Sequence, residues 1–198
     1  MAEVVIVESA DAAGGIAADA IENLVSRIFF LMIRRPPRST PLSTWRALAA
    51  RGLDLSRVRG FALDEYVGLP EGHPESYRAV ITREVVEPLG LTPELVRVPA
   101  DAGPLELAGA SYESAIDAAG GVDLQILGIG RTGHIGFNEP GSSFASLTRV
   151  KTLTDQTRRD NARFFPTLDD VPTHCITRGL GTIMRARHLV LLAFGEAK

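Results

Sequence analysis

The sequence contains one cysteine, Cys175, so its 198 residues cannot form an internal disulfide bond. It also lacks a basic excess, because its 21 lysines and arginines are outnumbered by 24 aspartates and glutamates and the net charge is −3. A surface of that charge offers no extended basic track for a nucleic-acid backbone. We therefore expect no nucleic-acid partner.

Long apolar runs and metal-ligand spacings are missing as well. The run IFFLMI at residues 28–33 is too short to span a bilayer, and the start, MAEVVIVESADAAGG, lacks the basic and apolar regions of a secretory leader. We expect a cytoplasmic protein with no membrane partner. We also expect no metal site, because the four histidines are scattered without ligand spacing, at His73, His134, His174 and His188.

What the sequence does contain is an alternation of aliphatic runs and helical patterns. The aliphatic runs predict strands over residues 4–9, 57–64, 122–130 and 187–195. The helical patterns predict helices over residues 12–27, capped by Asp11, over 76–90, closed by Gly90, and over 111–121, closed by Gly120. Together they predict an α/β fold for one domain, residues 1–198, with a doubly wound, largely parallel sheet in a Rossmann-like three-layer sandwich.

In such sheets, ligands bind where loops leave the carboxyl ends of the strands. Asp64, the loop that begins at Gly128 and the final segment FGEAK all follow predicted strands, so we expect them to face one pocket. Asp64 comes after aliphatic residues, and a poorly solvated carboxylate makes a usable base. The alternative is that Asp64 only caps the following turn.

The loop GIGRTGHIGFNEPGSSF, residues 128–144, carries the residue types that suggest chemistry. Gly128 and Gly130 would let backbone N–H groups approach a phosphate or sugar hydroxyls, although glycine is also ordinary at strand ends. If Glu139 holds one ring nitrogen of His134, the ring has a fixed tautomer and can exchange a proton near neutral pH. The alternative is a loop histidine that only forms a hydrogen bond with a glutamate.

The sequence contains LDEYVGLPEGHPESY at residues 63–77, LGIGRTGHIGFNEPGSSFAS at 127–146 and TRVKTLTDQTRRDNARFF at 148–165. Together these stretches resemble the glucosamine-6-phosphate deaminase family, and the resemblance runs through most of residues 41–198. It implies conversion of glucosamine 6-phosphate and water to fructose 6-phosphate and ammonia, in amino-sugar catabolism. This is an aldose–ketose isomerisation that expels the amine, and we expect the enzyme to be classed as a hydrolase. The resemblance implies no cofactor, a small-molecule amino-sugar phosphate as partner, and an intact protein that could form a homo-oligomer.

The resemblance also implies roles for individual residues. Asp64 would move a proton between C2 and C1 of the sugar, and His134 would open the pyranose ring with Glu139 as its partner. Thr132 stands where the family usually has Asp or Asn. Its hydroxyl can donate or accept a hydrogen bond but carries no charge, so we expect Thr132 to support His134 in a different way.

Two phosphate sites follow from the same resemblance. The substrate site comprises Ser39, Thr40, Gly128, Gly130, Arg163 and Lys198. Arginine offers a planar fork for phosphate, although Arg163 taken alone would be interpreted as a solvated helix charge. A second site, for the activator N-acetylglucosamine 6-phosphate, is implied at Ser142, Arg149 and Lys151, where Leu147 stands in place of a common arginine.

Two regions depart from the family pattern. Residues 28–40, IFFLMIRRPPRST, occupy the place of a glycine-rich phosphate loop, and their two prolines remove backbone donors. They form either a divergent loop whose arginines meet phosphate or a foreign segment, since they resemble translated sequencing adaptor. The chain also stops at Lys198, where family members continue. We therefore expect a fragment of the domain, incomplete at the C-terminus, whose uncovered apolar surface lowers its stability and could cost it activity.

Two other functions fit parts of the sequence. A 6-phosphogluconolactonase-like hydrolase has a similar glycine–histidine loop, but GHIGFNEP together with LDEYVGL favours the deaminase. A sugar-phosphate sensing domain of a transcription regulator would bind without turnover. Asp64, His134, Glu139 and the lack of a helix-turn-helix pattern argue against such a sensor.

Overall fold

The computed structural model of the protein describes residues 3–25, 30–31, 41–100 and 104–195. Most of the unusual segment at 28–40 therefore lies outside the described residues, and its foreign origin stays a prediction.

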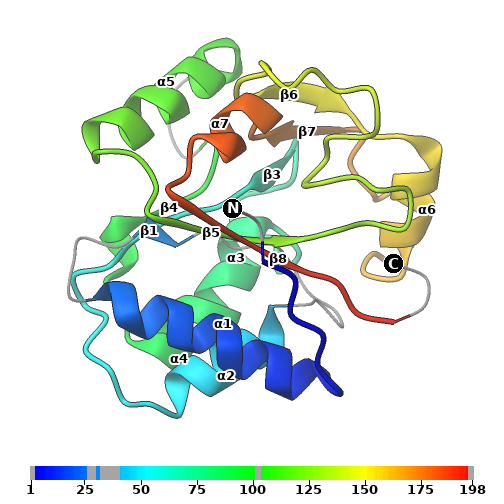
Figure 1. Ribbon diagram of the computed structural model, residues 1–198. Helices are drawn as coiled ribbons and strands as arrows, with labels where there is room; N and C mark the ends of the chain where they lie inside the picture. Colours follow the sequence, from blue (N-terminus) through cyan, green and yellow to red (C-terminus); the bar gives the residue numbers. More distant parts are fainter. Residues whose placement is uncertain (1–2, 26–29, 32–40, 101–103, 196–198) are drawn as a thin grey trace.

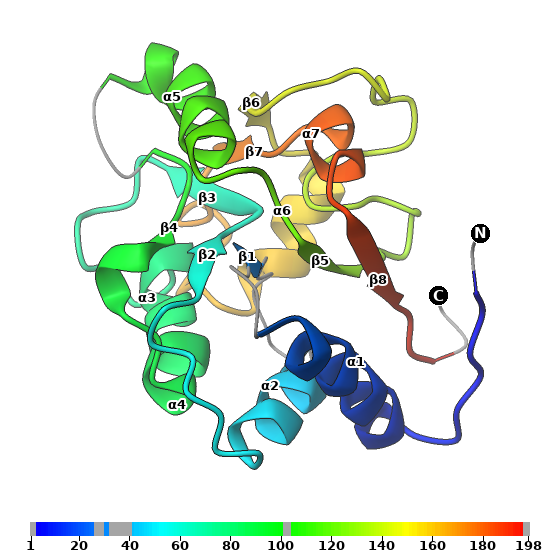
Figure 2. The same ribbon diagram turned by 60° about the vertical axis from the view of Figure 1, so that its left-hand side comes forward.

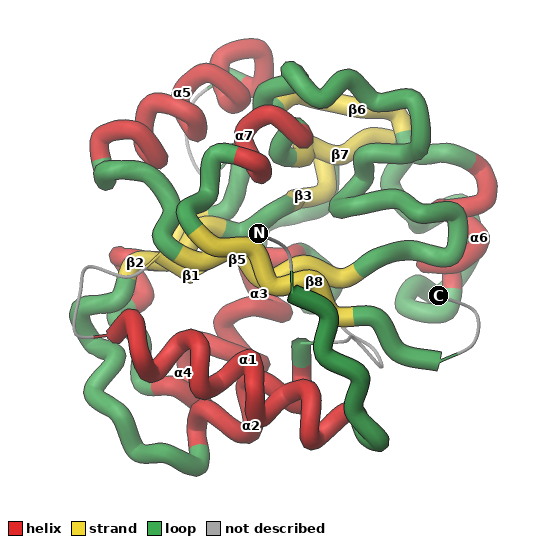
Figure 3. The backbone as a smooth tube through the Cα atoms, in the orientation of Figure 1, coloured by secondary structure: helices red, strands yellow, loops and turns green. Residues whose placement is uncertain are grey.

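Five of the described strands form the parallel part of the fold. β1 (Phe30–Leu31), β2 (Arg59–Phe61) and β4 (Val96–Arg97) pair in the order β1-β2-β4, and both pairings are parallel. β5 (Leu124–Gly128) pairs in parallel with β8 (His188–Leu192), and β1 lies beside β5 (Figure 3). The predicted α/β fold with parallel strands is confirmed.

Helices lie on both faces of these strands (Figures 1 and 2). One face carries α1 (Ala10–Val25), α2 (Leu42–Ala49), α3 (Tyr77–Ile81) and α4 (Glu87–Leu89), with a π-helical turn, Thr82–Val86, between α3 and α4. The other face carries α5 (Leu105–Ala118) and α7 (Leu180–Met184). A 3₁₀ turn, Pro93–Leu95, precedes β4. Gly90 ends α4 at φ 63°, in the left-handed region that glycine adopts at low cost, as its position in the sequence predicted.

A separate, antiparallel sheet was not predicted. It has the order β3-β7-β6, from β3 (Asp64–Val67), β7 (His174–Thr177) and β6 (Arg149–Thr152), and α6 (Asp155–Ala162) follows β6. The prediction of one strand ending at Asp64 is therefore wrong. β2 ends at Phe61, Ala62 still donates to the Arg97 carbonyl, and the Leu63 carbonyl accepts from Arg178 beside β7. The chain changes partners at this point, so Asp64 begins a strand instead of ending one.

Two further predictions near the N-terminus are wrong. Residues 4–9 form no strand, and Val4 and Ile6 are 86% and 93% exposed, because no described strand pairs with this segment. The helix begins at Ala10, and the Ser9 hydroxyl accepts from the Ala12 amide at 3.1 Å. Ser9 therefore caps α1 in place of Asp11. The predicted helix at 111–121 also begins earlier, at Leu105.

The core has two clusters of buried apolar side chains. The larger one includes Ile21 and Leu48 from α1 and α2 and Ile126 from β5, all 0–1% exposed. The smaller one packs Phe61 edge-on against Tyr112 of α5, with ring centroids 5.7 Å apart. Among the described helices, none combines the length and apolar character that crossing a membrane requires.

Candidate active site

The loop after β5 folds back on itself around His134. Gly130 donates its amide to the His134 carbonyl at 2.8 Å, and the His134 ring occupies the space that any side chain at position 130 would need. A side chain at 130 would therefore displace the His134 ring. Gly128 is buried as the last residue of β5. The predicted contact of these two glycines with a phosphate stays a prediction.

Thr132 connects His134 to Glu139. Its Oγ1 lies 2.9 Å from His134 Nδ1 and donates to Glu139 Oε2 at 2.9 Å. His134 Nδ1 is 3.6 Å from Glu139 Oε1. A threonine hydroxyl has one hydrogen, and if Glu139 receives it, the hydroxyl faces Nδ1 as an acceptor. In that arrangement Nδ1 carries the hydrogen and the neutral ring keeps its basic lone pair on Nε2.

A second threonine holds Glu139 from α6. Thr157 Oγ1 donates to Glu139 Oε1 at 3.3 Å, so both carboxylate oxygens accept hydrogen bonds from hydroxyl groups. The His134 and Glu139 side chains are 15% and 27% exposed, which leaves them within reach of a small molecule. The pairing of His134 with Glu139 that the spacing suggested is present, with Thr132 between them.

Asp64 lies at the start of β3, opposite Thr177 of β7, and both residues are 0% exposed. The Thr177 hydroxyl donates to Asp64 Oδ1 and accepts from the Phe137 amide at 3.3 Å. Gly136, at φ 60°, passes so close that a Cβ there would lie 3.1 Å from Asp64 Oδ1. The loop that carries His134 and Glu139 therefore rests directly on Asp64.

Glu65, beside Asp64, has a structural role. Its Oε1 accepts the amides of Tyr66 and Tyr77 at 2.7 and 2.9 Å, and its Oε2 accepts the Arg78 amide at 2.9 Å. Two of these amides belong to the first turn of α3, where a carboxylate also interacts favourably with the helix dipole. Both oxygens of Glu65 are thus engaged in holding α3.

Asn138 anchors the other side of the loop. Its amide nitrogen donates to the carbonyls of Ile135 and Arg178 at 3.0 and 2.7 Å, and its oxygen accepts from Arg149 at 2.9 Å. Arg178 is fully buried and donates to Gln125 at 3.1 Å. Burial lowers the pKa of the Arg178 guanidinium to about 10.

Of the residues predicted for an activator, Ser142 belongs to this loop and Arg149 contacts it. Arg149 and Lys151 are two residues apart on β6, so their side chains lie on the same face of the strand. Burial lowers the pKa of Arg149. Ser142 donates its amide to the Glu139 carbonyl at 3.0 Å, and Leu147 is 51% exposed. Arg149 thus contacts the loop itself, through Asn138.

The residues predicted to bind the substrate phosphate are only partly described. Arg163 is exposed at the end of α6, with its guanidinium 4.9 Å from the centre of the Phe164 ring. Ser39, Thr40 and Lys198 lie outside the described residues. The phosphate site therefore stays a prediction.

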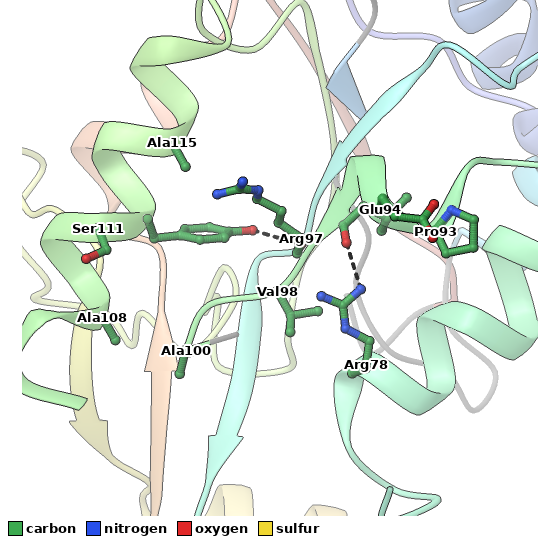
Figure 4. Close-up of a pocket in the computed structure, with 11 residues that line it drawn as sticks. Arg78, Pro93, Glu94, Arg97, Val98, Ala100, Ala108, Ser111 and Ala115 are labelled. Atoms are coloured by element: carbon green, nitrogen blue, oxygen red, sulfur yellow. Dashed lines mark hydrogen bonds between the residues drawn. The ribbon is translucent and has the colours of Figure 1, made fainter. Parts of the chain in front are cut away.

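A separate cavity of about 550 Å³ lies between α5 and residues 93–100 (Figure 4). Its lining includes Arg78 and Arg97, but Arg78 donates to the Val96 carbonyl at 2.7 Å, and Figure 4 shows the Arg97 guanidinium group on the side of α5, away from that hydrogen bond. Two cations that do not converge give no defined anion site. None of the catalytic, substrate-binding or activator residues predicted from the sequence lines this cavity.

No pattern in the sequence indicated a role for Thr177. It is 113 residues from Asp64 along the chain, and a threonine after the aliphatic Ile176 is ordinary in a strand. Prediction of the antiparallel pairing of β3 with β7 would have placed it opposite Asp64.

Comparisons with known proteins give consistent results. Residues 39–198 match the model of a family described as glucosamine-6-phosphate isomerases/6-phosphogluconolactonase. The glucosamine-6-phosphate deaminase of Bifidobacterium longum (strain NCC 2705) is 56% identical, over 100% of this chain and 78% of that protein. The corresponding Streptomyces coelicolor protein is 52% identical, over 99% of this chain and 77% of its own length.

Solved structures agree with these sequence matches. A monomeric glucosamine-6-phosphate deaminase matches with a TM-score of 0.89 and 34% identity, covering 96% of this chain and 81% of its own. The 6-phosphogluconolactonase of Thermotoga maritima matches with a TM-score of 0.73 and 19% identity, covering 98% and 84%. At that identity the second match shows the fold alone.

Proposed function

Because the chain belongs to the family of glucosamine-6-phosphate isomerases and 6-phosphogluconolactonases, we propose that it converts glucosamine 6-phosphate to fructose 6-phosphate and ammonia, in amino-sugar catabolism. Relatives that are 52–56% identical over nearly the whole chain carry the name glucosamine-6-phosphate deaminase, which favours this substrate over a lactone. The expected class of hydrolase is wrong. The family is described by isomerases and the relatives by deamination, so the reaction is an isomerisation with loss of the amine.

The first step is opening of the sugar ring by His134. The ring nitrogen Nε2 takes the proton from the O1 hydroxyl and returns a proton to the ring oxygen, which gives the open-chain aldehyde. Glu139 and Thr132 hold Nδ1 and favour the protonated ring that forms in between. Thr132 supplies a hydroxyl where a carboxylate would supply charge, so Glu139 provides the negative charge of this group.

The second step moves a proton from C2 to C1. The Asp64 carboxylate accepts the C2 proton, and the C1 carbonyl oxygen gains a proton as the C1=C2 double bond forms. Asp64 then returns its proton to C1 while the C2 amine loses one proton and becomes an imine, which balances the proton gained by the C1 oxygen. Water adds to C2 as ammonia leaves, which produces the C2 ketone. Burial of Asp64 favours this role because a poorly solvated carboxylate is a stronger base.

One observation carries the proposal: the loop with His134 and Glu139 rests on Asp64 through Gly136 and the Phe137–Thr177 hydrogen bond. This contact supports the proposal that the base and the ring-opening group belong to one site. For the substrate phosphate we propose Arg163 and the loop glycines 128 and 130, together with Ser39, Thr40 and Lys198. For an activating sugar phosphate we propose Ser142, Arg149 and Lys151.

The test measures ammonia and fructose 6-phosphate released from glucosamine 6-phosphate by the purified enzyme. We expect the two products in equal amounts, and no acceleration of 6-phosphogluconolactone hydrolysis. Lactone hydrolysis without ammonia release would show that the protein is a lactonase and not a deaminase. Binding of glucosamine 6-phosphate without turnover would show that it is a sensor.

A further inference from the structure

We propose that Thr177 is a positioning residue for this reaction, which holds the Asp64 carboxylate in register with the loop that carries His134 and Glu139. The inference rests on the proposed function, since it concerns the base of that reaction. In this role, one buried hydroxyl connects Asp64 of β3 to the loop that follows β5.

The first argument is the register of the antiparallel pair. Asp64 of β3 lies directly opposite Thr177 of β7, and both side chains are completely buried. Directly opposed side chains on one face of an antiparallel pair lie within contact distance. Thr177 donates its hydroxyl hydrogen to Asp64 Oδ1 at this position. The strand pairing thus determines which residue faces the base.

The second argument is the direction of the hydrogen bonds. The Phe137 amide can only donate, and it donates to the Thr177 oxygen at 3.3 Å. The hydroxyl hydrogen is therefore available for Asp64 Oδ1, which must accept it. This arrangement suits an ionised carboxylate, the form that a base needs before it takes the C2 proton.

The third argument is the close packing around the pair. A Cβ on Gly136 would lie 3.1 Å from Asp64 Oδ1 and 3.2 Å from Thr177 Oγ1, so the loop backbone packs against both side chains. Movement of the carboxylate would therefore require movement of the loop or loss of the hydroxyl contact. Proton transfer depends on such placement, because misplacement of a reacting group by about 1 Å can cost about 10²-fold in rate.

The test compares Thr177→Val and Thr177→Ser with the unchanged enzyme. Valine has the shape of threonine without the hydroxyl, and serine keeps the hydroxyl. We expect Thr177→Val to lower kcat by about 10- to 100-fold, with KM for glucosamine 6-phosphate changed by less than about 2-fold, and to slow exchange of the C2 proton with deuterated water to the same extent. Thr177→Ser should retain most of kcat.

Thr182→Val is the matched control. Thr182 is also a buried threonine, 1% exposed, whose hydroxyl donates to a carboxylate, that of Glu113. Its loss should lower the melting temperature and leave kcat within about 2-fold, because Glu113 takes no part in the proposed chemistry. If Thr177→Val proves too unstable to purify, Thr177→Cys replaces it, since a thiol is of similar size and a weak donor.

The outcomes separate the inference from the function. An unchanged enzyme that releases no ammonia contradicts the proposed function and, with it, the inference. An active enzyme in which Thr177→Val or Thr177→Cys loses no more kcat than Thr182→Val overturns the inference alone. The same holds if Thr177→Ser is as slow as Thr177→Val, or if KM changes and kcat does not.

Discussion

Thr132 donates the hydrogen of its hydroxyl to Glu139 Oε2 at 2.9 Å, in the loop that follows β5. Thr132 Oγ1 also lies 2.9 Å from His134 Nδ1. The uncharged side chain of Thr132 thus connects the Glu139 carboxylate to the His134 ring. This arrangement uses a residue type that differs from the Asp or Asn expected at 132, and it predicts a specific consequence of removing the hydroxyl.

Thr132→Val should slow turnover of the closed-ring substrate by about 10-fold, the order expected for loss of one hydrogen bond that orients the ring. Steady-state release of ammonia from glucosamine 6-phosphate measures this. Thr132→Ser keeps the hydroxyl and should retain most of the rate. If Thr132→Val is fully active, the direct contact of 3.6 Å between His134 and Glu139 is sufficient on its own.

His134→Gln should slow turnover of the closed-ring substrate by roughly 10²-fold or more, the usual contribution of a general acid–base group. An open-chain substrate analogue should lose much less, because it needs no ring opening. His188→Gln, an exposed histidine at the start of β8, serves as the control. Equal losses on both substrates would show that His134 does not act in ring opening.

Asp64→Asn keeps the shape of the side chain and removes its basic oxygen. Exchange of the C2 proton with deuterated water, followed by NMR, should fall below detection while glucosamine 6-phosphate still binds. Glu65→Gln should instead lower the melting temperature and leave exchange in place, because Glu65 accepts three backbone amides at 2.7–2.9 Å and holds α3. Exchange that persists in Asp64→Asn and stops in Glu65→Gln would reverse these assignments.

Local patterns allowed part of this structure to be predicted. The periodicity of α1, the continuous burial of β5 and the glycine that ends α4 all follow from interactions within a few residues. Glu139 lies five positions after His134, so a short motif was enough to predict that the two side chains pair. The hydrogen bond from Thr132 to Glu139 was found only in the structure.

Contacts between distant segments could not be predicted from these patterns. The Thr177–Asp64 hydrogen bond joins strands 113 residues apart, and the contact of Arg149 with Asn138 depends on where β6 lies beside the loop. The antiparallel pairing of β3 and β7 decides both the end of β2 and the position of Asp64. A sequence that satisfies a parallel α/β pattern carries no local signal for that pairing.

The stability of the fold should depend on pH through Glu113. Burial alone would raise the pKa of Glu113, but hydrogen bonds from Thr148 and Thr182 and the charge of Arg185 lower it below its ordinary value of 4.5. The folded state thus binds this proton less readily than the unfolded chain, so the stabilisation is present above 4.5 and is lost as pH falls through the folded-state pKa.

The corresponding measurement compares melting temperatures of the unchanged protein and Glu113→Gln. The difference should be largest at about pH 6 and should shrink as the pH is lowered below 4.5, through the lower folded-state pKa of Glu113. Glu84→Gln removes a carboxylate from a surface ion pair with Arg83 and should give a small difference throughout this pH range. A difference for Glu113→Gln that stays constant over this range would contradict the assigned direction.

Gly136 offers a direct test of the contact between the loop and Asp64. Alanine at 136 meets two penalties: a left-handed backbone at φ 60°, which costs about 1–2 kcal/mol, and a Cβ only 3.1 Å from Asp64 Oδ1. Gly141→Ala, at φ 90° in the same loop with nothing within 4 Å of its Cβ, meets the backbone penalty alone. Both variants should therefore have a lower melting temperature than the unchanged protein. Only Gly136→Ala should slow C2 proton exchange, by about 10-fold or more, because it displaces the Asp64 carboxylate. Equal exchange rates in the two variants would mean that the carboxylate does not depend on this loop for its position.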